Sequence, residues 1–436
     1  MKRPGFHLLA KPTGPICNLD CTYCFYLEKE RLYPGTAVWA MPDDVLESFV
    51  RQYITTQDIP VISFAWQGGE PTLLGLDFYR KAVAFQQKYA GGRRIENAFQ
   101  TNGVLLDDEW GAFLAEHDFL VGLSIDGPGP LHNRYRVNRG GGPTLRDVLR
   151  GRDALRRHNV RFNTITVVHR ENASVPLDVY RFLRDEGSGY MQFIPIVERV
   201  SPAAGAAGDL LALGLPGTAG SGAVTPWSVE AEAFGAFLCG IFDEWVRTDV
   251  GRVFVQIFDV ALESWYAGDA SLCIFAQHCG RALAVEHNGD LYSCDHYVFP
   301  PYKLGNILRT PIHEMVERPQ QREFGAAKAS MLPTYCLECD VRFACNGECP
   351  KNRFIRTPNG EPGLNYLCAG YQRFFRHIDP YMRFMAQALR RERPPANVMA
   401  WTRARDAAQA PSPVAPNDPC PCGSGKKHRK CCGRSA

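Results

Sequence analysis

The sequence predicts an α/β fold of parallel βα units, followed by a small cysteine-rich region and a short metal-binding tail. Three observations support this. Over the first two hundred residues, short β-rich runs alternate with amphipathic helical stretches. The chain holds 16 cysteines, and all except Cys239 fall in clusters. The last cluster is separated from the others by a stretch rich in Pro and Ala.

The alternation defines the order of the expected elements. Strands are expected at residues 6–10, 61–66, 95–100, 119–124, 161–168 and 190–194. The helices expected between them are residues 43–57, 76–90, 107–117, 144–158 and 174–186, several of them opened by a capping Asp, Thr or Ser. Single helices between strands imply parallel strands with right-handed crossovers. A six-unit open barrel and a doubly wound sheet both fit, and in either fold a ligand binds at the carboxyl ends of the strands.

Composition divides the chain into four segments. Residues 1–225 hold the βα units and end in a Gly/Ala-rich insertion at 201–225, which we expect to be a flexible loop. Residues 226–393 hold two helical stretches and the middle cysteines. Residues 394–416 are expected to be a linker, and residues 417–436 carry the last cysteines.

Bulk composition excludes several classes of protein. A chain of 436 residues that is 45% hydrophobic and 22% charged is typical of a globular protein rather than a disordered one. The formal net charge of +3 argues against a protein that coats nucleic acid, and no sequence-specific nucleic-acid partner is expected. No apolar run approaches the ~20 residues that span a bilayer, so membrane insertion is not expected. The N-terminal residues are not expected to be a signal peptide, because Pro12 interrupts their short apolar run.

These exclusions decide how the cysteines are interpreted. The cytoplasmic location that we expect keeps thiols reduced, so clustered cysteines indicate metal or iron–sulfur sites rather than disulfides. Cys239 lies in an apolar helical pattern, and we expect it to be a small buried hydrophobic residue without chemistry.

The first cluster is Cys17-x3-Cys21-x2-Cys24, directly after the first expected strand. Three thiolates are one short of a closed structural zinc site. They suffice for a [4Fe–4S] cluster that keeps one iron open, and this iron can chelate the amino and carboxylate groups of a small ligand. A thioredoxin-type pair of Cys21 and Cys24 is the alternative, which Cys17 and the aromatic flanks disfavour.

This motif, together with Gly68-Gly69-Glu70-Pro71 after the second strand, resembles the radical S-adenosylmethionine (radical SAM) superfamily. The resemblance implies a partial (β/α)6 TIM-like barrel in which the three cysteines hold the catalytic cluster. It also implies SAM contacts from the following residues: Tyr23, Gly68, Ser124, Arg136 and Val197.

The middle region supplies eight thiolates, enough for two closed [4Fe–4S] clusters or two structural zinc sites. The pattern, including Gly289-x4-Cys294, resembles the SPASM extension of radical SAM enzymes. The resemblance implies that one auxiliary cluster is held by Cys273, Cys279, Cys294 and Cys349. It implies that the other is held by Cys336, Cys339, Cys345 and Cys368.

The sequence around these cysteines is similar to that of one family within that superfamily, the anaerobic sulfatase-maturating enzymes. The similar segments run from Cys279 to His296, over Leu304-Gly305-Asn306-Ile307 and over Cys349-Pro350-Lys351-Asn352-Arg353, and the resemblance covers residues 5–385. It implies oxidation of a Cys or Ser in a nascent or unfolded sulfatase, within a Cys/Ser-x-Pro-x-Arg motif, to Cα-formylglycine. A 5′-deoxyadenosyl radical from SAM would remove a hydrogen from Cβ, an auxiliary cluster would take an electron, and Asp295 would take a proton. A flavodoxin or ferredoxin would supply low-potential electrons.

The tail contains Cys420-x-Cys422-x8-Cys431-Cys432 and resembles the SEC-C zinc motif. Four thiolates with few apolar residues around them indicate that a bound zinc ion supplies the folding energy, and a disordered basic tail is the alternative. Lys426, Lys427, Arg429, Lys430 and Arg434 make the tail cationic, so it could dock on a ribosome, a chaperone or another acidic surface.

Two other functions fit the same residues. A SPASM enzyme could modify another ribosomal peptide by thioether crosslinking or epimerisation. A zinc-clustered binding protein without catalysis would need the same cysteines but no SAM.

Overall fold

A ten-stranded sheet forms the centre of the computed structural model, which describes residues 5–200, 223–409 and 416–432. Its strand order is β10-β9-β8-β1-β2-β3-β4-β5-β6-β7. The strands are β1 (His7–Lys11), β2 (Val61–Trp66), β3 (Arg94–Thr101), β4 (Leu120–Ser124), β5 (Phe162–Val168), β6 (Tyr190–Pro195), β7 (Phe254–Val255), β8 (Ala282–Glu286), β9 (Asp290–Tyr292) and β10 (Lys303–Asn306). Neighbours from β8 to β7 are parallel, whereas β9 and β10 are antiparallel.

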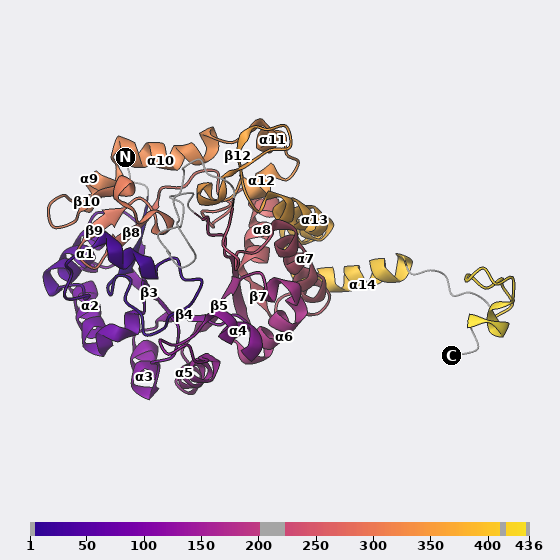
Figure 1. Cartoon of the computed structure of the whole chain (residues 1–436), viewed down its shortest axis with the longest axis horizontal. Helices are drawn as coiled ribbons and strands as arrows, with labels where there is room; N and C mark the ends of the chain where they lie inside the picture. Colours follow the sequence, from indigo (N-terminus) through magenta and orange to yellow (C-terminus); the bar gives the residue numbers. More distant parts are fainter. Residues whose placement is uncertain (1–4, 201–222, 410–415, 433–436) are drawn as a thin grey trace.

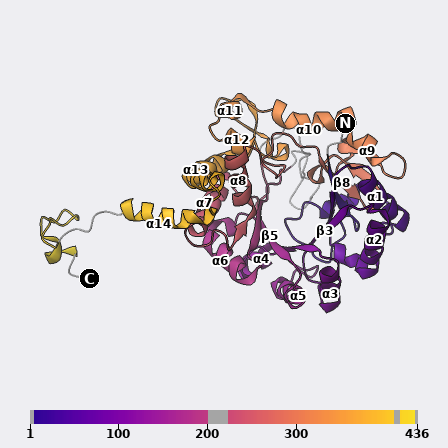
Figure 2. The same cartoon turned by 180° about the vertical axis from the view of Figure 1, so that it is seen from behind.

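The order of the first six strands distinguishes the two predicted folds. β1 to β6 lie side by side in sequence order, without the reversal that a doubly wound sheet requires. The sheet curves, and its helices lie on the outside (Figures 1 and 2). The predicted partial barrel is therefore confirmed.

The helices after these strands cover the outer face of the barrel. They are α1 (Asp43–Thr55), α2 (Gly75–Tyr89), α3 (Asp108–Glu116), α4 (Gly129–Tyr135), α5 (Leu145–Arg157) and α6 (Pro176–Glu186). All except the short α4 were expected from the sequence. The Phe49 ring of α1 packs against Phe64 and Trp66 of β2, so an aromatic cluster forms part of the core between helix and sheet.

The second half of the chain extends both edges of the barrel. β7 pairs with β6, and β8 pairs with β1 in a register that places Glu286 beside Lys11. The helices α7 (Ala231–Thr248), α8 (Gln256–Ala267) and α13 (Cys368–Arg390) pack together. A Cβ on Gly370 of α13 would lie 2.1 Å from the Ala231 carbonyl oxygen of α7, so only glycine permits this approach. Cys239 is buried on α7, as predicted.

The remaining elements form the cysteine-rich region. They are α9 (Ile312–Val316), α10 (Pro319–Ser330), α11 (Thr334–Leu337), α12 (Arg342–Cys345), β11 (Ile355–Arg356) and β12 (Pro362–Leu364), with several short 3-10 turns between them. None of the helices in the described ranges is long and apolar enough to cross a membrane.

The linker expected at 394–416 needs correction in its first half. A 3-10 turn, η8 (Pro395–Asn397), leads into α14 (Val398–Gln409). The Trp401 ring stacks on Phe384 at a centroid distance of 4.9 Å and contacts Tyr381 at 5.7 Å. The prolines that suggested a linker flank this helix rather than interrupt it. Most of the insertion expected at 201–225 lies outside the described residues.

Candidate active site

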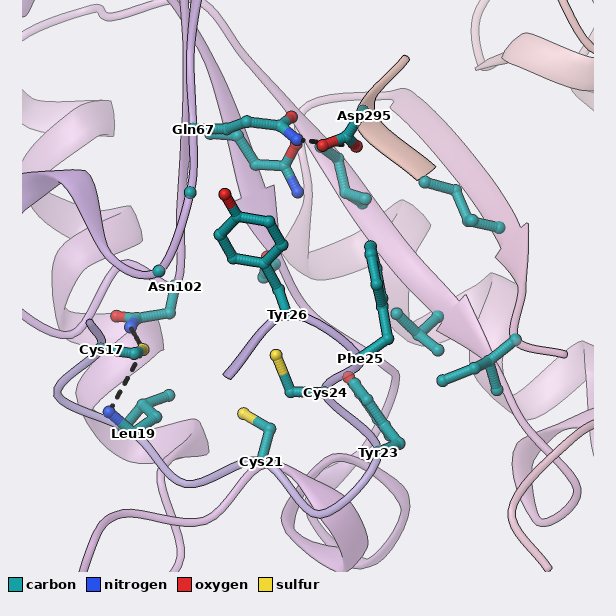
Figure 3. Close-up of a pocket in the computed structure, with 18 of the residues that line it drawn as sticks. Cys17, Leu19, Cys21, Tyr23, Cys24, Phe25, Tyr26, Gln67, Asn102 and Asp295 are labelled. Carbon is teal, nitrogen blue, oxygen red and sulfur yellow. Dashed lines mark hydrogen bonds between the residues drawn. The ribbon is translucent and has the colours of Figure 1, made fainter. Parts of the chain in front are cut away.

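A cavity of about 320 Å³ opens at the carboxyl ends of the barrel strands, within the size range of small-molecule sites. The loop between β1 and α1 contributes all three cysteines of the first cluster to its lining (Figure 3). An apolar wall comes from β5, β6 and the residue that follows β6, and another side of the lining is polar. The wall consists of Ile165, Val167, Ile194 and Ile196, and the polar side includes Gln67, Thr101, Asn102 and Ser124.

Hydrogen-bond donors point at the first cysteine. The Sγ of Cys17 accepts from the Leu19 backbone N–H at 3.3 Å and from Asn102 Nδ2 at 3.7 Å. Burial raises the pKa of the Cys17 and Cys21 thiols to about 12, and it also raises the pKa of Cys24. A bound cation reverses this preference and holds the sulfurs as thiolates. The described lining has no fourth thiol, so the donor set fits a [4Fe–4S] cluster with one open iron.

The Gly68-Gly69-Glu70-Pro71 segment holds the cysteine loop against the barrel. Gly69 donates its N–H to the Gly14 carbonyl at 2.8 Å, and a Cβ on Gly69 would lie 1.9 Å from the Ile16 carbonyl oxygen. The buried Glu70 carboxylate accepts from the Asn102 N–H at 2.8 Å and from the Thr101 hydroxyl at 2.8 Å. The segment therefore joins the ends of β2 and β3 to the loop that carries the cysteines.

Four of the five residues predicted to contact SAM line this cavity: Tyr23, Gly68, Ser124 and Arg136. Val197 does not line it, although its neighbours Ile196 and Glu198 do. The Val197 carbonyl instead accepts a hydrogen bond of 2.7 Å from Lys351 Nζ.

Arg136 and Tyr23 are oriented by Asp126, which the sequence analysis did not assign to the site. Arg136 donates to both Asp126 carboxylate oxygens, at 2.9 and 3.2 Å, and the Tyr23 hydroxyl donates to the same carboxylate at 2.5 Å. Burial opposes ionisation of Asp126, but the Arg136 charge and hydrogen bonds, together with the nearby His132 and His169, outweigh burial and lower the pKa of Asp126. The only sequence signal for this role was the position of Asp126 at the end of the fourth strand.

Asp295 enters the cavity from the other half of the chain, on a 3-10 turn (Asp295–Tyr297) directly after Cys294. It forms an ion pair with the buried Lys11, and its Oδ2 accepts from Gln67 Nε2 at 3.1 Å (Figure 3). Burial tends to raise the pKa of Asp295, but Lys11, His296 and the Gln67 hydrogen bond together lower it. Asp295 is therefore a carboxylate, able to accept a proton.

The middle cysteines gather in the two predicted sets. Cys336, Cys339, Cys345 and Cys368 line one small cavity. In the other set, Cys294 lies close enough to Cys349 and Cys273 for their charges to raise its pKa further, beyond the dominant effect of burial. Charge on Cys273 affects Cys279 in the same way.

The tail places its four sulfurs around one point. The Cys420, Cys422, Cys431 and Cys432 sulfurs lie within 4.8 Å of one another. The Cys422 sulfur lies 3.3 Å from that of Cys420 and 3.4 Å from that of Cys431. Both distances are near the ~3.8 Å edge of a tetrahedron with zinc–sulfur bonds of about 2.3 Å. Within the described ranges, these four cysteines are the one group of three or more potential metal ligands whose ligand atoms all lie within 4.8 Å of one another.

Comparisons with known proteins agree with this arrangement. Residues 12–183 match the radical SAM superfamily, 273–340 the SPASM iron-sulfur cluster-binding domain, and 417–434 the SEC-C motif. A serine-type anaerobic sulfatase-maturating enzyme of Bacteroides thetaiotaomicron is 50% identical over 90% of this chain and 94% of its own length. A cysteine-type enzyme of Clostridium perfringens is 32% identical over 86% of this chain and 97% of its own length.

A solved structure is similar over the same extent. Native anSMEcpe with bound AdoMet and Cp18Cys peptide has a TM-score of 0.77 and 32% identity, and the match covers 88% of this chain and all of that one. Streptococcus suis SuiB, with a TM-score of 0.52 and 13% identity, shares the fold alone.

Proposed function

Because this chain belongs to the anaerobic sulfatase-maturating enzymes of the radical SAM superfamily, we propose that it oxidises a serine of a sulfatase polypeptide to Cα-formylglycine. The family acts on Cys or Ser. Serine is favoured because three serine-type relatives are 50%, 37% and 36% identical to this chain, whereas three cysteine-type relatives are 32%, 33% and 29% identical. Family membership sets aside the non-catalytic zinc protein and the crosslinking or epimerising enzyme.

SAM and iron–sulfur clusters are the cofactors of this chain. We assign the open cluster to Cys17, Cys21 and Cys24, and the two closed clusters to the middle cysteine sets. When bound, these groups supply one-electron chemistry and a 5′-deoxyadenosyl radical that removes hydrogen from the target Cβ. The apolar wall of the cavity suits the adenosine of SAM, and the polar side, with Arg136, suits its methionine carboxylate.

The chain's own residues then handle the proton. Asp295 is the proposed base, because it lies in the same cavity as the cysteine loop and is held as a carboxylate. Lys11 and Gln67 each contact one of its oxygens, which holds the carboxylate in place at the cavity wall. The proton released from the target hydroxyl passes to this carboxylate.

The remaining assignments concern location and partners. We propose a cytoplasmic enzyme that receives electrons from a flavodoxin or ferredoxin and acts on unfolded sulfatase. The tail would bind zinc through its four cysteines, since their spacing fits a tetrahedral site. Its cationic side chains would dock on an acidic surface.

A peptide assay tests this function. Two peptides that differ only in carrying Ser or Cys within an x-Pro-x-Arg context are incubated under anoxia with SAM and a reductant. We expect an aldehyde in the Ser peptide, detected by hydrazine labelling. A crosslinked or epimerised peptide, or an aldehyde in the Cys peptide alone, would overturn the proposal.

A further inference from the structure

One face of α10 contacts the loops that carry Cys273, Cys279 and Cys294. These are three of the four cysteines proposed to hold one auxiliary cluster. Gln321, Gly325 and Lys328 are spaced at i, i+4 and i+7, so they share one side of this helix. Gln321 Nε2 donates to the Gly280 carbonyl at 2.8 Å and to the Ser293 carbonyl at 3.1 Å. These carbonyls belong to residues adjacent to Cys279 and Cys294.

The middle position of this face sets the distance between helix and loop. A Cβ on Gly325 would lie 2.5 Å from the Cys279 carbonyl oxygen, so a larger residue would push the helix away. The Cys279 N–H donates to the Gly325 carbonyl at 3.3 Å. Lys328, one turn further along, is thereby brought over the loop that begins at Cys273.

The Lys328 side chain is fully buried, with 0% exposure. Its Nζ donates to three backbone carbonyls, those of Cys273, Ile274 and Ala276. Three carbonyl acceptors require three N–H groups, which an ammonium has and a neutral amine lacks. The contacts therefore identify Lys328 as a buried positive charge.

This charge lies near three cysteine sulfurs and one carboxylate, that of Glu348. Lys328 interacts electrostatically with Cys273, Cys279 and Cys349, three of the four cysteines of the set. The nearby Glu348 carboxylate accepts hydrogen bonds from Asn352 Nδ2 at 3.2 Å and from Asn365 Nδ2 at 2.6 Å. Arg353, a half-buried cation, donates to the Lys328 carbonyl but faces cysteines of both sets.

We infer that Lys328 is the buried counter-charge of the auxiliary cluster held by Cys273, Cys279, Cys294 and Cys349, and that it raises the reduction potential of this cluster. The inference rests on the proposed ligand set. Taking up one electron makes a four-thiolate cluster one unit more negative, and a fixed positive charge in a poorly solvated site stabilises the reduced form. A higher potential makes the cluster a better electron acceptor. Lys328 is thus a positioning and tuning residue that does not touch substrate.

Redox titration of the full chain tests this. Cys17→Ala, Cys21→Ala and Cys24→Ala are combined to remove the signal of the open cluster, and the two auxiliary clusters are followed by electron paramagnetic resonance. Lys328→Met removes the charge, Lys328→Gln keeps hydrogen-bond donors without charge, and Lys328→Arg keeps the charge. Arg376→Gln is the control, because Arg376 is an exposed cation beside the other set, paired with Asp340.

The expected result is a more negative midpoint potential for one cluster in Lys328→Met and Lys328→Gln, with iron content retained and Lys328→Arg close to the parent. Arg376→Gln should leave both potentials in place, since water screens its charge. Unchanged potentials in the neutral variants would overturn the inference. Equal shifts of the potential in Lys328→Arg and Lys328→Met would also overturn it, as would loss of the cluster from all three variants. Either result would show that the shape of the side chain, rather than its charge, affects the cluster. An absence of auxiliary iron in the parent would instead contradict the proposed ligand set.

Discussion

Asp295 forms an ion pair with Lys11, which lies 284 residues earlier in the sequence. The pair therefore joins two distant parts of the chain. Lys11 is buried at the end of β1, and its ammonium also lies over the Tyr26 ring, 4.2 Å from the centroid. A buried carboxylate keeps its charge only when such a partner compensates for the loss of water. The ion pair therefore explains how Asp295 remains a carboxylate within the cavity.

Replacing this carboxylate separates the two halves of the reaction. In Asp295→Asn, we expect formylglycine formation to fall by at least about 100-fold, the typical contribution of a positioned base. SAM cleavage and iron content should remain, because the three cysteines of the open cluster are untouched. Both products are measured in one reaction by chromatography and mass spectrometry. Formylglycine at the parent's yield would show that another group takes the proton.

The sequence identified the residues of this site unevenly, for a physical reason. The cysteines were predictable because ligands of one cluster lie at short, fixed spacings, and Asp295 because it follows Cys294. Lys11 was missed as a site residue because its partner Asp295 is distant in sequence, and Asp126 was missed because its contacts with Tyr23 and Arg136 form only in the folded chain. Nothing in the local pattern around Lys11 shows that β8 will lie beside β1.

Helix α14 shows that a whole element can also be misjudged when only the local sequence is considered. Its sequence was interpreted as a linker because prolines and alanines surround it, yet its Trp401 packs on Phe384 of α13. Helices that are short in isolation depend on such tertiary contacts. The barrel elements were easier to predict because their apolar periodicity persists over many residues, as in α1.

Removing the Trp401 ring tests whether α14 is part of the folded core. Trp401→Ala should lower the free energy of unfolding by about 2 kcal/mol, less than the ~3–5 kcal/mol of a fully buried aromatic residue. Arg403→Ala, at an exposed position of the same helix, is the matched control and should change it little. Chemical denaturation of the two variants measures the difference. Equal stabilities would mean that α14 behaves as the linker first expected.

Considered as a whole, the molecule has a nearly balanced charge of +3, and this small positive excess coincides with the basic, cysteine-rich tail. The barrel, the cysteine-rich region and α14 account for the described residues up to Gln409, whereas the tail contributes nothing to the described cavity lining. Its chemistry also differs. Its sulfurs are spaced for a single tetrahedral ion rather than a cluster.

Zinc analysis separates the tail from the catalytic part. The full chain should bind one more zinc ion than a variant truncated after Pro416, while both form aldehyde in a free peptide at the same rate. Cys420→Ala with Cys432→Ala should lose the same zinc ion without truncation. Metal content is measured by mass spectrometry after anaerobic reconstitution. If the truncated and full chains carry equal zinc, the four tail cysteines are not a zinc site.

In the proposed reaction, a SAM-derived radical removes hydrogen from the target Cβ, and an aldehyde forms at this carbon. The most direct test of this reaction is a serine peptide deuterated at Cβ, incubated with the enzyme, SAM and reductant under anoxia. We predict that 5′-deoxyadenosine gains one deuterium and that the same peptide yields formylglycine. Deuterium-free 5′-deoxyadenosine alongside a modified peptide would contradict the proposed reaction, because the hydrogen would then have come from another atom.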